Sequence, residues 1–169
     1  MGTARIADMA EALIAFGGNV GDARATIAKA IAVFCDGETV VLLKRSSDYK
    51  TPPWGVTEQP AFVNAAISVS TSLSPQALLR RAHSIERAFG RDRDREDRRW
   101  GPRTIDIDVL AYEDLVLQEP EMTLPHPRVL ERAFVLVPLV EIAPDRKIGG
   151  ISIRTALERL DRSGIERLP

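Results

Sequence analysis

Two segments of the chain alternate strictly between apolar residues and polar or small ones, and this alternation limits most what the chain can fold into. Residues 61–71 read AFVNAAISVST, in which Val63, Ile67 and Val69 fall on one side. Residues 105–111 read IDIDVLA and alternate in the same way. A period of two residues is typical of strands that bury one face of a sheet. We therefore expect a sheet with one apolar face against a core and a second face that carries polar side chains.

The order of the predicted strands and helices indicates a fold class. Residues 12–16 and 39–49 predict two more strands, whereas 22–34 and 75–89 repeat apolar residues at helical spacing. Ser74, followed by a proline, is typical of the start of a helix. The order strand, helix, strand, strand, helix, strand predicts an α+β fold, a ferredoxin-like βαββαβ sandwich with an antiparallel sheet and both helices on one face.

The two ends of the chain add little to this pattern. Short helices are predicted at 133–142 and 152–161, which gives a short helical C-terminal extension. We expect a loose N-terminal tail over 1–10 and a single domain over 11–169. Because the two long helices cover only one face of the predicted sheet, we expect the functional residues on the other, open face.

Charge and cysteine content argue against several classes of protein. The chain has 23 Lys and Arg against 24 Asp and Glu, a net charge of −1, whereas a dedicated nucleic-acid binder usually carries a basic excess. Cys35 is the single cysteine, which excludes an internal disulfide or a cysteine-based metal cage, and we expect a buried, inert thiol. No apolar run approaches the ~18 residues of a membrane span, and Asp8 and Glu11 do not fit a signal peptide. We expect a cytoplasmic protein.

The strongest local pattern is the pair of carboxylates in the strand at 105–111. Asp106 and Asp108 are two residues apart, so they point to the same face, roughly 6.5–7 Å from each other along the backbone. Two carboxylates this close repel each other unless a cation lies between them, and Mg²⁺ typically takes one or two carboxylates together with substrate phosphates. A solvated face of an edge strand is the alternative. The pattern predicts a metal site at these two residues.

An arginine-rich segment precedes this strand. Residues 90–103 read GRDRDREDRRWGPR and hold six arginines, at 91, 93, 95, 98, 99 and 103. Guanidinium groups on a flexible loop can fold onto a polyphosphate and make bidentate contacts that lysine cannot make. A solvated mobile loop is the alternative. Because Arg103 lies three residues before Asp106, cation, metal and phosphate could share one site.

Two histidines and further arginines are candidates for contacts with the same ligand. Thr123, His126 and Arg132 follow the strand, and His126 stands between two prolines, which make its backbone rigid. A single histidine is more often a hydrogen-bonded structural residue than a catalyst. His83 and Glu86 lie on one side of the second long helix, and we interpret them as surface or nucleotide-rim residues.

A third group of residues favours the binding of a flat heterocycle. Phe62 and Asn64 share the open face of the predicted sheet, and the proline-stiffened loop at 51–55 carries Trp54. Phe134 could complete an aromatic pair from the other side, and an asparagine amide could hydrogen-bond to the edge of a ring. The alternative is a small hydrophobic cluster under a long loop.

Four segments, in order along the chain, together point to a known family. They are Gly17-Gly18-Asn19 after the first strand, the stretch from Tyr49 to Asn64, the string RWGPRTIDID at 99–108, and Leu124-Pro125-His126 followed by Arg132-Ala133-Phe134. Over roughly residues 12–145, the chain resembles the 6-hydroxymethyl-7,8-dihydropterin pyrophosphokinase family of folate biosynthesis. The resemblance implies an ATP-dependent diphosphotransferase. Such an enzyme moves pyrophosphate from ATP to the hydroxyl of the dihydropterin and releases AMP, with two Mg²⁺ ions bridging the triphosphate and the two aspartates.

The resemblance also implies roles for individual residues. Asp106 and Asp108 would be the metal ligands and, together with Arg91 and Arg103, the catalytic residues. The pterin would be bound by Thr51, Trp54, Phe62, Asn64, Trp100 and Phe134. ATP would be bound by His83, Glu86, Arg93, Arg99, Arg103, Thr123, His126 and Arg132.

Some positions depart from the family pattern. Serine, tyrosine, glutamine and arginine are common in the family at the positions of Gly18, Phe62, His83 and Glu121, respectively.

Two other functions are alternatives. An RNA-binding module of the same fold would carry aromatic residues where this chain has Ile-Asp-Ile-Asp. A non-catalytic sensor could use the aromatic slot but would need neither the arginines nor the carboxylate pair. We expect a monomeric enzyme that acts on small molecules, with no nucleic acid or membrane as partner.

Overall fold

One antiparallel sheet forms the centre of the computed structural model, which describes residues 8–53, 55, 57–91 and 103–169. The described strands run in the order β10-β3-β4-β1-β5, and β2 pairs with β4 beside β3. The bounds are β1 Ala10–Gly18, β2 Val40–Arg45, β3 Tyr49–Thr51, β4 Phe62–Thr71, β5 Asp106–Tyr112 and β10 Glu166–Arg167. The predicted sheet is confirmed.

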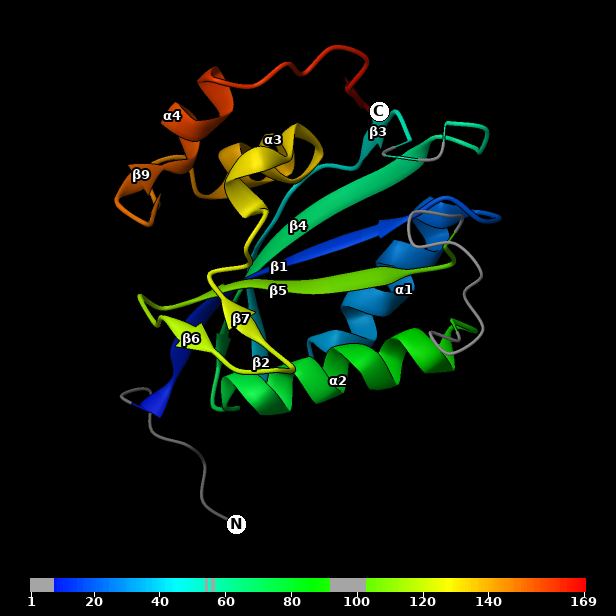
Figure 1. Cartoon of the computed structure of the whole chain (residues 1–169). Helices are drawn as coiled ribbons and strands as arrows, with labels where there is room; N and C mark the ends of the chain where they lie inside the picture. Colours follow the sequence, from blue (N-terminus) through cyan, green and yellow to red (C-terminus); the bar gives the residue numbers. More distant parts are fainter. Residues whose placement is uncertain (1–7, 54, 56, 92–102) are drawn as a thin grey trace.

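Helices lie on both faces of this sheet (Figure 1). The helices α1 (Ala23–Phe34) and α2 (Pro75–Ala88) cover one face, as predicted. The helix α3 (Ala133–Ile142) lies over part of the other face, and α4 (Ile153–Glu158) packs against α3. A short 3₁₀ helix, η3, precedes α3 at Val129–Glu131. Two small hairpins, β6–β7 (Leu117–Gln118 and Thr123–Leu124) and β8–β9 (Lys147–Ile148 and Ile151–Ser152), connect these elements.

The alternation along the strands builds two cores, one on each face of the same sheet. Ile14, Ile67 and Ile107 point to the core shared with α1 and α2. Their neighbours Leu13 and Ala66 belong to a second core under α3 and α4. The expectation of an open second face is therefore wrong for half of the sheet, because the C-terminal helices are apolar enough to bury it.

Local signals set the ends of the helices. Asp22 Oδ1 accepts a hydrogen bond of 3.1 Å from the Ala25 N–H, and Ser74 Oγ accepts one of 3.1 Å from the Ala77 N–H. These contacts satisfy N–H groups that the first turn of a helix leaves without a partner. The predicted starts of both long helices are confirmed, whereas the last helix ends at Glu158 instead of residue 161.

Two sequence predictions need correction. The predicted strand at 39–49 is two strands, because the polar residues Ser46, Ser47 and Asp48 form a corner between β2 and β3. The thiol of Cys35 is half-buried instead of fully buried, and desolvation raises its pKa to about 11, so it stays protonated at neutral pH. No helix in the described part of the chain is both long and apolar enough to cross a membrane.

The second core predicts a clear response to a cavity. Leu136 of α3 is fully buried, whereas Val116 is 75% exposed. We expect Leu136→Ala to lower the free energy of unfolding by about 2–5 kcal/mol and Val116→Ala to change it by about 0.5 kcal/mol or less. Denaturant unfolding measures both values. Equal effects of the two substitutions would contradict the packing of α3 on the sheet.

Candidate active site

The part of the second face that α3 leaves uncovered forms a hollow of about 620 Å³, the first hollow. It lies where β1 ends, where β4 and β5 begin and where α3 starts. Its polar and aromatic lining comes from residues distant in the sequence, namely Thr51, Phe62, Asn64, Arg103, Asp106, Asp108, Arg132 and Phe134. The structure thus brings together the predicted carboxylates and four of the six residues predicted to bind a flat ring. Trp54 and Trp100 lie outside the described residues, as do Arg93 and Arg99.

The strand register gives the first hollow its floor. Gly17 of β1 pairs with Asn64 of β4 on one side and with Asp106 of β5 on the other. A Cβ atom at Gly17 would lie 2.6 Å from Asn64 Oδ1, so only glycine leaves room for the amide. The amide is oriented as well, because Asn64 Nδ2 donates a hydrogen bond of 2.7 Å to Thr51 Oγ1.

Two guanidinium groups contact the first carboxylate. Asp106 Oδ1 accepts a hydrogen bond of 2.6 Å from Arg91 Nη1, and Asp106 Oδ2 accepts one of 3.1 Å from Arg103 Nη1. The side chain of Arg91 is 3% exposed and also forms an ion pair with Glu86. The predicted proximity of arginine and aspartate is confirmed, with both arginines paired to Asp106.

The interpretation of Glu86 as a surface or rim residue is wrong. Glu86 is 1% exposed and lies against the guanidinium of Arg91. A buried carboxylate needs a positive partner and hydrogen bonds to offset its desolvation, and Arg91 provides both. The sequence placed Glu86 correctly on the helix α2 but gave no signal that this side of the helix is covered.

A second hollow, of about 690 Å³, lies on the other side of Asp108. Its polar lining comprises His83, Asp108, Glu121, Thr123 and His126. Three of the residues predicted to bind ATP therefore share one hollow. Asp108 lines both hollows, so a group held at this carboxylate can be reached from either side.

The surroundings of His126 determine the tautomer and the charge of its ring. Its backbone N–H donates a hydrogen bond of 2.8 Å to the Leu110 carbonyl, and its ring Nδ1 accepts one of 3.2 Å from the backbone N–H of Arg128. A ring nitrogen that accepts is unprotonated, so the neutral ring carries its proton on Nε2. Burial and the nearby positive charge of Arg132 lower the pKa of His126, while the Asp106 carboxylate acts in the opposite direction. The ring is therefore neutral at pH 7.

Arg132 lies beside the aromatic side of the first hollow. Its guanidinium carbon is 5.7 Å from the centre of the Phe134 ring, a cation–π distance. Burial lowers the pKa of Arg132, and the nearby carboxylate of Asp108 opposes this shift. The sequence assigned Arg132 to ATP and Phe134 to the ring slot, whereas the structure places the two side chains together.

Asn19 is a buried polar residue whose role the sequence reading missed. Its Nδ2 donates to Gln59 Oε1 and to the Pro60 carbonyl, at 3.0 and 2.9 Å, and its Oδ1 accepts from the Arg103 N–H at 2.9 Å. One side chain thus joins the end of β1 to the segments that precede β4 and β5. The Gly-Gly-Asn sequence after a predicted strand was the available signal.

The carboxylates of the site are suited to a magnesium ion that is also bound by substrate phosphates. Among the described residues, no group of three or more His, Cys, Asp or Glu side chains gathers where it could hold a metal ion. Asp106 and Asp108 are two carboxylates on one face, beside the second hollow. Mg²⁺ is bound in this manner when substrate phosphates and water complete its octahedral shell.

Comparisons with known proteins show which family the sequence matches. The sequence model of the 7,8-dihydro-6-hydroxymethylpterin-pyrophosphokinase (HPPK) family matches residues 13–144. The 2-amino-4-hydroxy-6-hydroxymethyldihydropteridine pyrophosphokinase of Methylorubrum extorquens is 51% identical over 160 residues, which are 95% of this chain and 99% of the relative. The protein of the same name from Bacillus subtilis is 37% identical, over 92% of this chain and 93% of the relative.

A solved structure supports the fold. The crystal structure of wild-type Plasmodium falciparum HPPK-DHPS with pteroate superimposes with a TM-score of 0.69 at 14% identity. The match covers 89% of this chain and 42% of the solved chain, so this chain spans less than half the length of that protein. At this identity the likeness concerns the fold alone.

The glycine at the floor of the first hollow gives a test of the strand register. We expect Gly17→Ala to lower the free energy of unfolding by about 1–3 kcal/mol, because the new methyl group overlaps the Asn64 amide. The cost should be smaller in an Asn64→Ala background, where the overlapping atom is absent. Denaturant unfolding of the four proteins of this cycle measures the difference. The same cost in both backgrounds would contradict the register.

The lowered pKa of His126 predicts how stability depends on pH. The unfolded chain takes up the proton at about pH 6.5, before the folded chain does, so the free energy of unfolding falls as the pH falls through 6.5 toward the folded pKa. His126→Asn should lose less stability than the unmodified chain between about pH 7 and about pH 5. Urea unfolding over this range measures the two slopes. Parallel slopes would show that burial does not hold the ring neutral.

Proposed function

The chain belongs to the 7,8-dihydro-6-hydroxymethylpterin-pyrophosphokinase family, and from this we propose how its residues divide the work of the reaction. The enzyme transfers pyrophosphate from its co-substrate ATP to the hydroxyl of 6-hydroxymethyl-7,8-dihydropterin in folate biosynthesis. The pterin hydroxyl oxygen forms a bond to the β-phosphorus and its proton is released to the solvent. The bond between that phosphorus and the oxygen of the α-phosphate breaks, and AMP leaves.

The pterin occupies the first hollow in this proposal. Phe62 and Phe134 hold the two faces of the ring, and the amide of Asn64 reads its edge. The hydrogen bond to Thr51 supports this role of Asn64, because it fixes which way the amide points. Trp54 and Trp100 remain proposed pterin contacts on the resemblance to the family.

ATP occupies the second hollow, with its triphosphate directed toward Asp108. His83, Thr123 and His126 line this hollow, and the neutral His126 can donate from Nε2 to a phosphate oxygen. Arg132 reaches the triphosphate from the first hollow, and Glu86 acts on ATP through Arg91. Arg93 and Arg99 are further proposed ATP contacts on the resemblance alone.

Asp106 and Asp108 are the proposed ligands of two Mg²⁺ ions. Bound there, Mg²⁺ would neutralise the triphosphate and hold it in line with the pterin hydroxyl. In the structure, Arg91 and Arg103 contact Asp106, which offsets the repulsion between the two carboxylates. With Mg²⁺ held at Asp106 and Asp108, these two guanidinium groups would stabilise the charge of the neighbouring phosphates, while Arg91 keeps its ion pair with Glu86.

One observation carries this proposal: Asp108 lines both hollows. Phosphoryl transfer depends mainly on positioning and on charge neutralisation. A carboxylate in the wall between two substrate hollows can hold a metal ion at the place where the two substrates must meet. We further propose a monomer and a cytoplasmic location, the latter because a chain with one cysteine needs no oxidising compartment.

The reaction itself tests the proposal. We expect AMP to form only when ATP, Mg²⁺ and the pterin alcohol are all present. Asp106→Asn and Asp108→Asn should each lower kcat/KM by about 100-fold or more, because a metal ion supplies several kcal/mol of transition-state stabilisation. The rate of AMP release, followed by chromatography, measures the effect.

Asp114→Asn is the matched control, since Asp114 is an exposed carboxylate after β5. It should leave the rate within about twofold of the unmodified enzyme. Thermal unfolding of all variants separates loss of chemistry from loss of fold. Full activity in both Asp106→Asn and Asp108→Asn, or AMP release without the pterin alcohol, would contradict the proposed site.

A further inference from the structure

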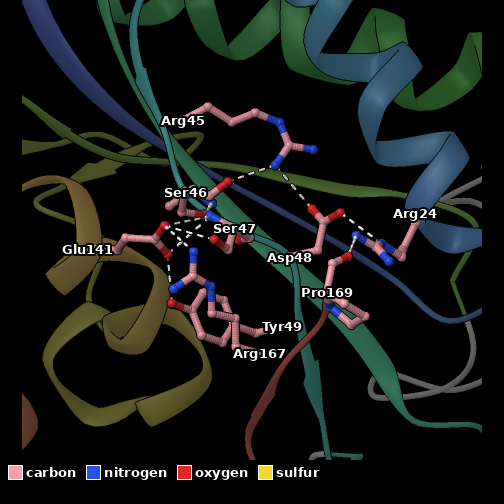
Figure 2. A network of polar contacts seen from close by, with 10 residues as sticks. Arg24, Arg45, Ser46, Ser47, Asp48, Tyr49, Glu141, Arg167 and Pro169 are labelled. Carbon is pink, nitrogen blue, oxygen red and sulfur yellow. Dashed lines mark hydrogen bonds and ion pairs between the residues drawn. The ribbon is translucent and has the colours of Figure 1, made fainter.

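A second carboxylate network lies at the corner between β2 and β3 (Figure 2), and none of its residues lines the first or the second hollow. Glu141, near the end of α3, accepts hydrogen bonds from the Ser47 N–H at 3.0 Å, from Ser47 Oγ at 2.8 Å and from the Tyr49 hydroxyl at 2.6 Å. Arg167 of β10 approaches the same carboxylate at 3.9 Å. One side chain of a helix is thus joined to two successive segments of the sheet edge.

The helix end of this network leads to the first hollow. Phe134 lines that hollow and lies seven residues before Glu141 on α3, which is about 10.5 Å along a helix. Pro138 removes one backbone hydrogen bond between them. Leu136 and Leu139, on either side of the proline, are fully buried, and close packing of this kind transmits a displacement at Glu141 along the helix.

The strand end of this network leads to the opposite wall of the first hollow. Tyr49 pairs with Asn64 in the register of β3 and β4, and Thr51 pairs with Phe62. β3 has only three residues, so it is held to β4 by few backbone contacts. The hydrogen bonds to Glu141 therefore add a connection between the strand that carries Thr51 and the helix that carries Phe134.

Apolar packing alone does not fix this spacing. The buried contacts of α3 with the sheet are made by aliphatic side chains, and the hydrophobic effect has no direction. Hydrogen bonds to a carboxylate have a defined length and angle, and charge strengthens them. They offset the effect of partial burial on Glu141, whose pKa is lowered, while burial and Glu141 raise the pKa of Tyr49 to about 12. At neutral pH, Glu141 is therefore a charged acceptor and Tyr49 a donor.

A second carboxylate steadies the same corner from the other side (Figure 2). Asp48 accepts from Arg24 of α1 at 3.0 Å and from Arg45 of β2 at 3.1 Å, and its carbonyl accepts from the Leu168 N–H at 2.9 Å. These contacts join the corner to α1, β2 and the C-terminal segment. Of these two carboxylates, Glu141 is the one that belongs to α3, so it is Glu141 that connects the corner to the first hollow.

We propose that Glu141 is a positioning residue for the pterin: through Ser47 and Tyr49 it sets the separation between Phe134 on α3 and the Thr51–Asn64 pair of the sheet. This inference rests on the proposed function, which puts the pterin in the first hollow. It extends the set of residues that determine pterin affinity to one that lines neither hollow. Of the proposed ATP contacts, Arg132 lies at the start of α3, whereas those in the second hollow lie on the far side of Asp108, so binding of ATP should depend much less on Glu141 than binding of the pterin.

Substitutions that keep the size of the side chains test the inference. We expect Glu141→Gln to weaken pterin binding about tenfold and Tyr49→Phe about threefold, with little change in kcat. The double variant should resemble Glu141→Gln, because the two residues act through one contact. Glu158→Gln, at an exposed carboxylate of α4, is the control and should match the unmodified enzyme.

Two equilibrium titrations test the inference, together with the KM for each substrate. Pterin affinity is measured by calorimetry in the presence of Mg²⁺ and a nonhydrolysable ATP analogue, and the affinity of the analogue is measured separately. A loss of affinity that is clearly larger for the pterin than for the analogue supports the inference. Unchanged pterin affinity, or an equal loss for both ligands, would overturn it. Failure of the unmodified enzyme to bind the pterin would overturn the proposed function and this inference with it.

Discussion

The register of three antiparallel strands around Gly17 is the constraint on which the rest of the site depends. It places Asn64 on one side of the glycine and Asp106 on the other, with no side chain between them. The two-residue period then aligns Asp108 with Asp106 while the intervening Ile107 stays in the core. A ring-binding amide and a metal-binding carboxylate therefore share one floor because of backbone geometry, and the helix α3 only has to supply the opposite wall.

Most of the fold follows from periodicity, and the parts that do not have physical reasons. The alternation at 61–71 and 105–111 predicts β4 and β5, since residues with one buried face alternate wherever the sheet lies. The same pattern cannot show what covers the other face, so burial by α3 was missed. The break at Ser46–Asp48 was missed because strand propensity extends across it, whereas its cause is the set of side-chain hydrogen bonds at the corner.

The residues of the candidate site were likewise predictable only in part. Asp106, Asp108, Asn64 and Phe134 were predicted because carboxylate, amide and aromatic groups carry their chemistry in the residue type, and the structure brings them together. Glu86 was misplaced because a helical pattern does not reveal which neighbours bury its polar side. Contacts that span 84 residues for Asn19 and 94 for Glu141 are properties of the tertiary structure, and no local pattern of the sequence predicts them.

Family membership fixes the reaction, and the two hollows that meet at Asp108 explain how one small domain can bring its two substrates together. The most direct test is a crystal structure of the enzyme with a nonhydrolysable ATP analogue, Mg²⁺ and the pterin alcohol. The account predicts metal ions within about 2.1 Å of carboxylate oxygens of both aspartates, bridging to the phosphates, with the pterin between Phe62 and Phe134. Phosphates remote from Asp106 and Asp108, or a pterin outside the first hollow, would contradict it.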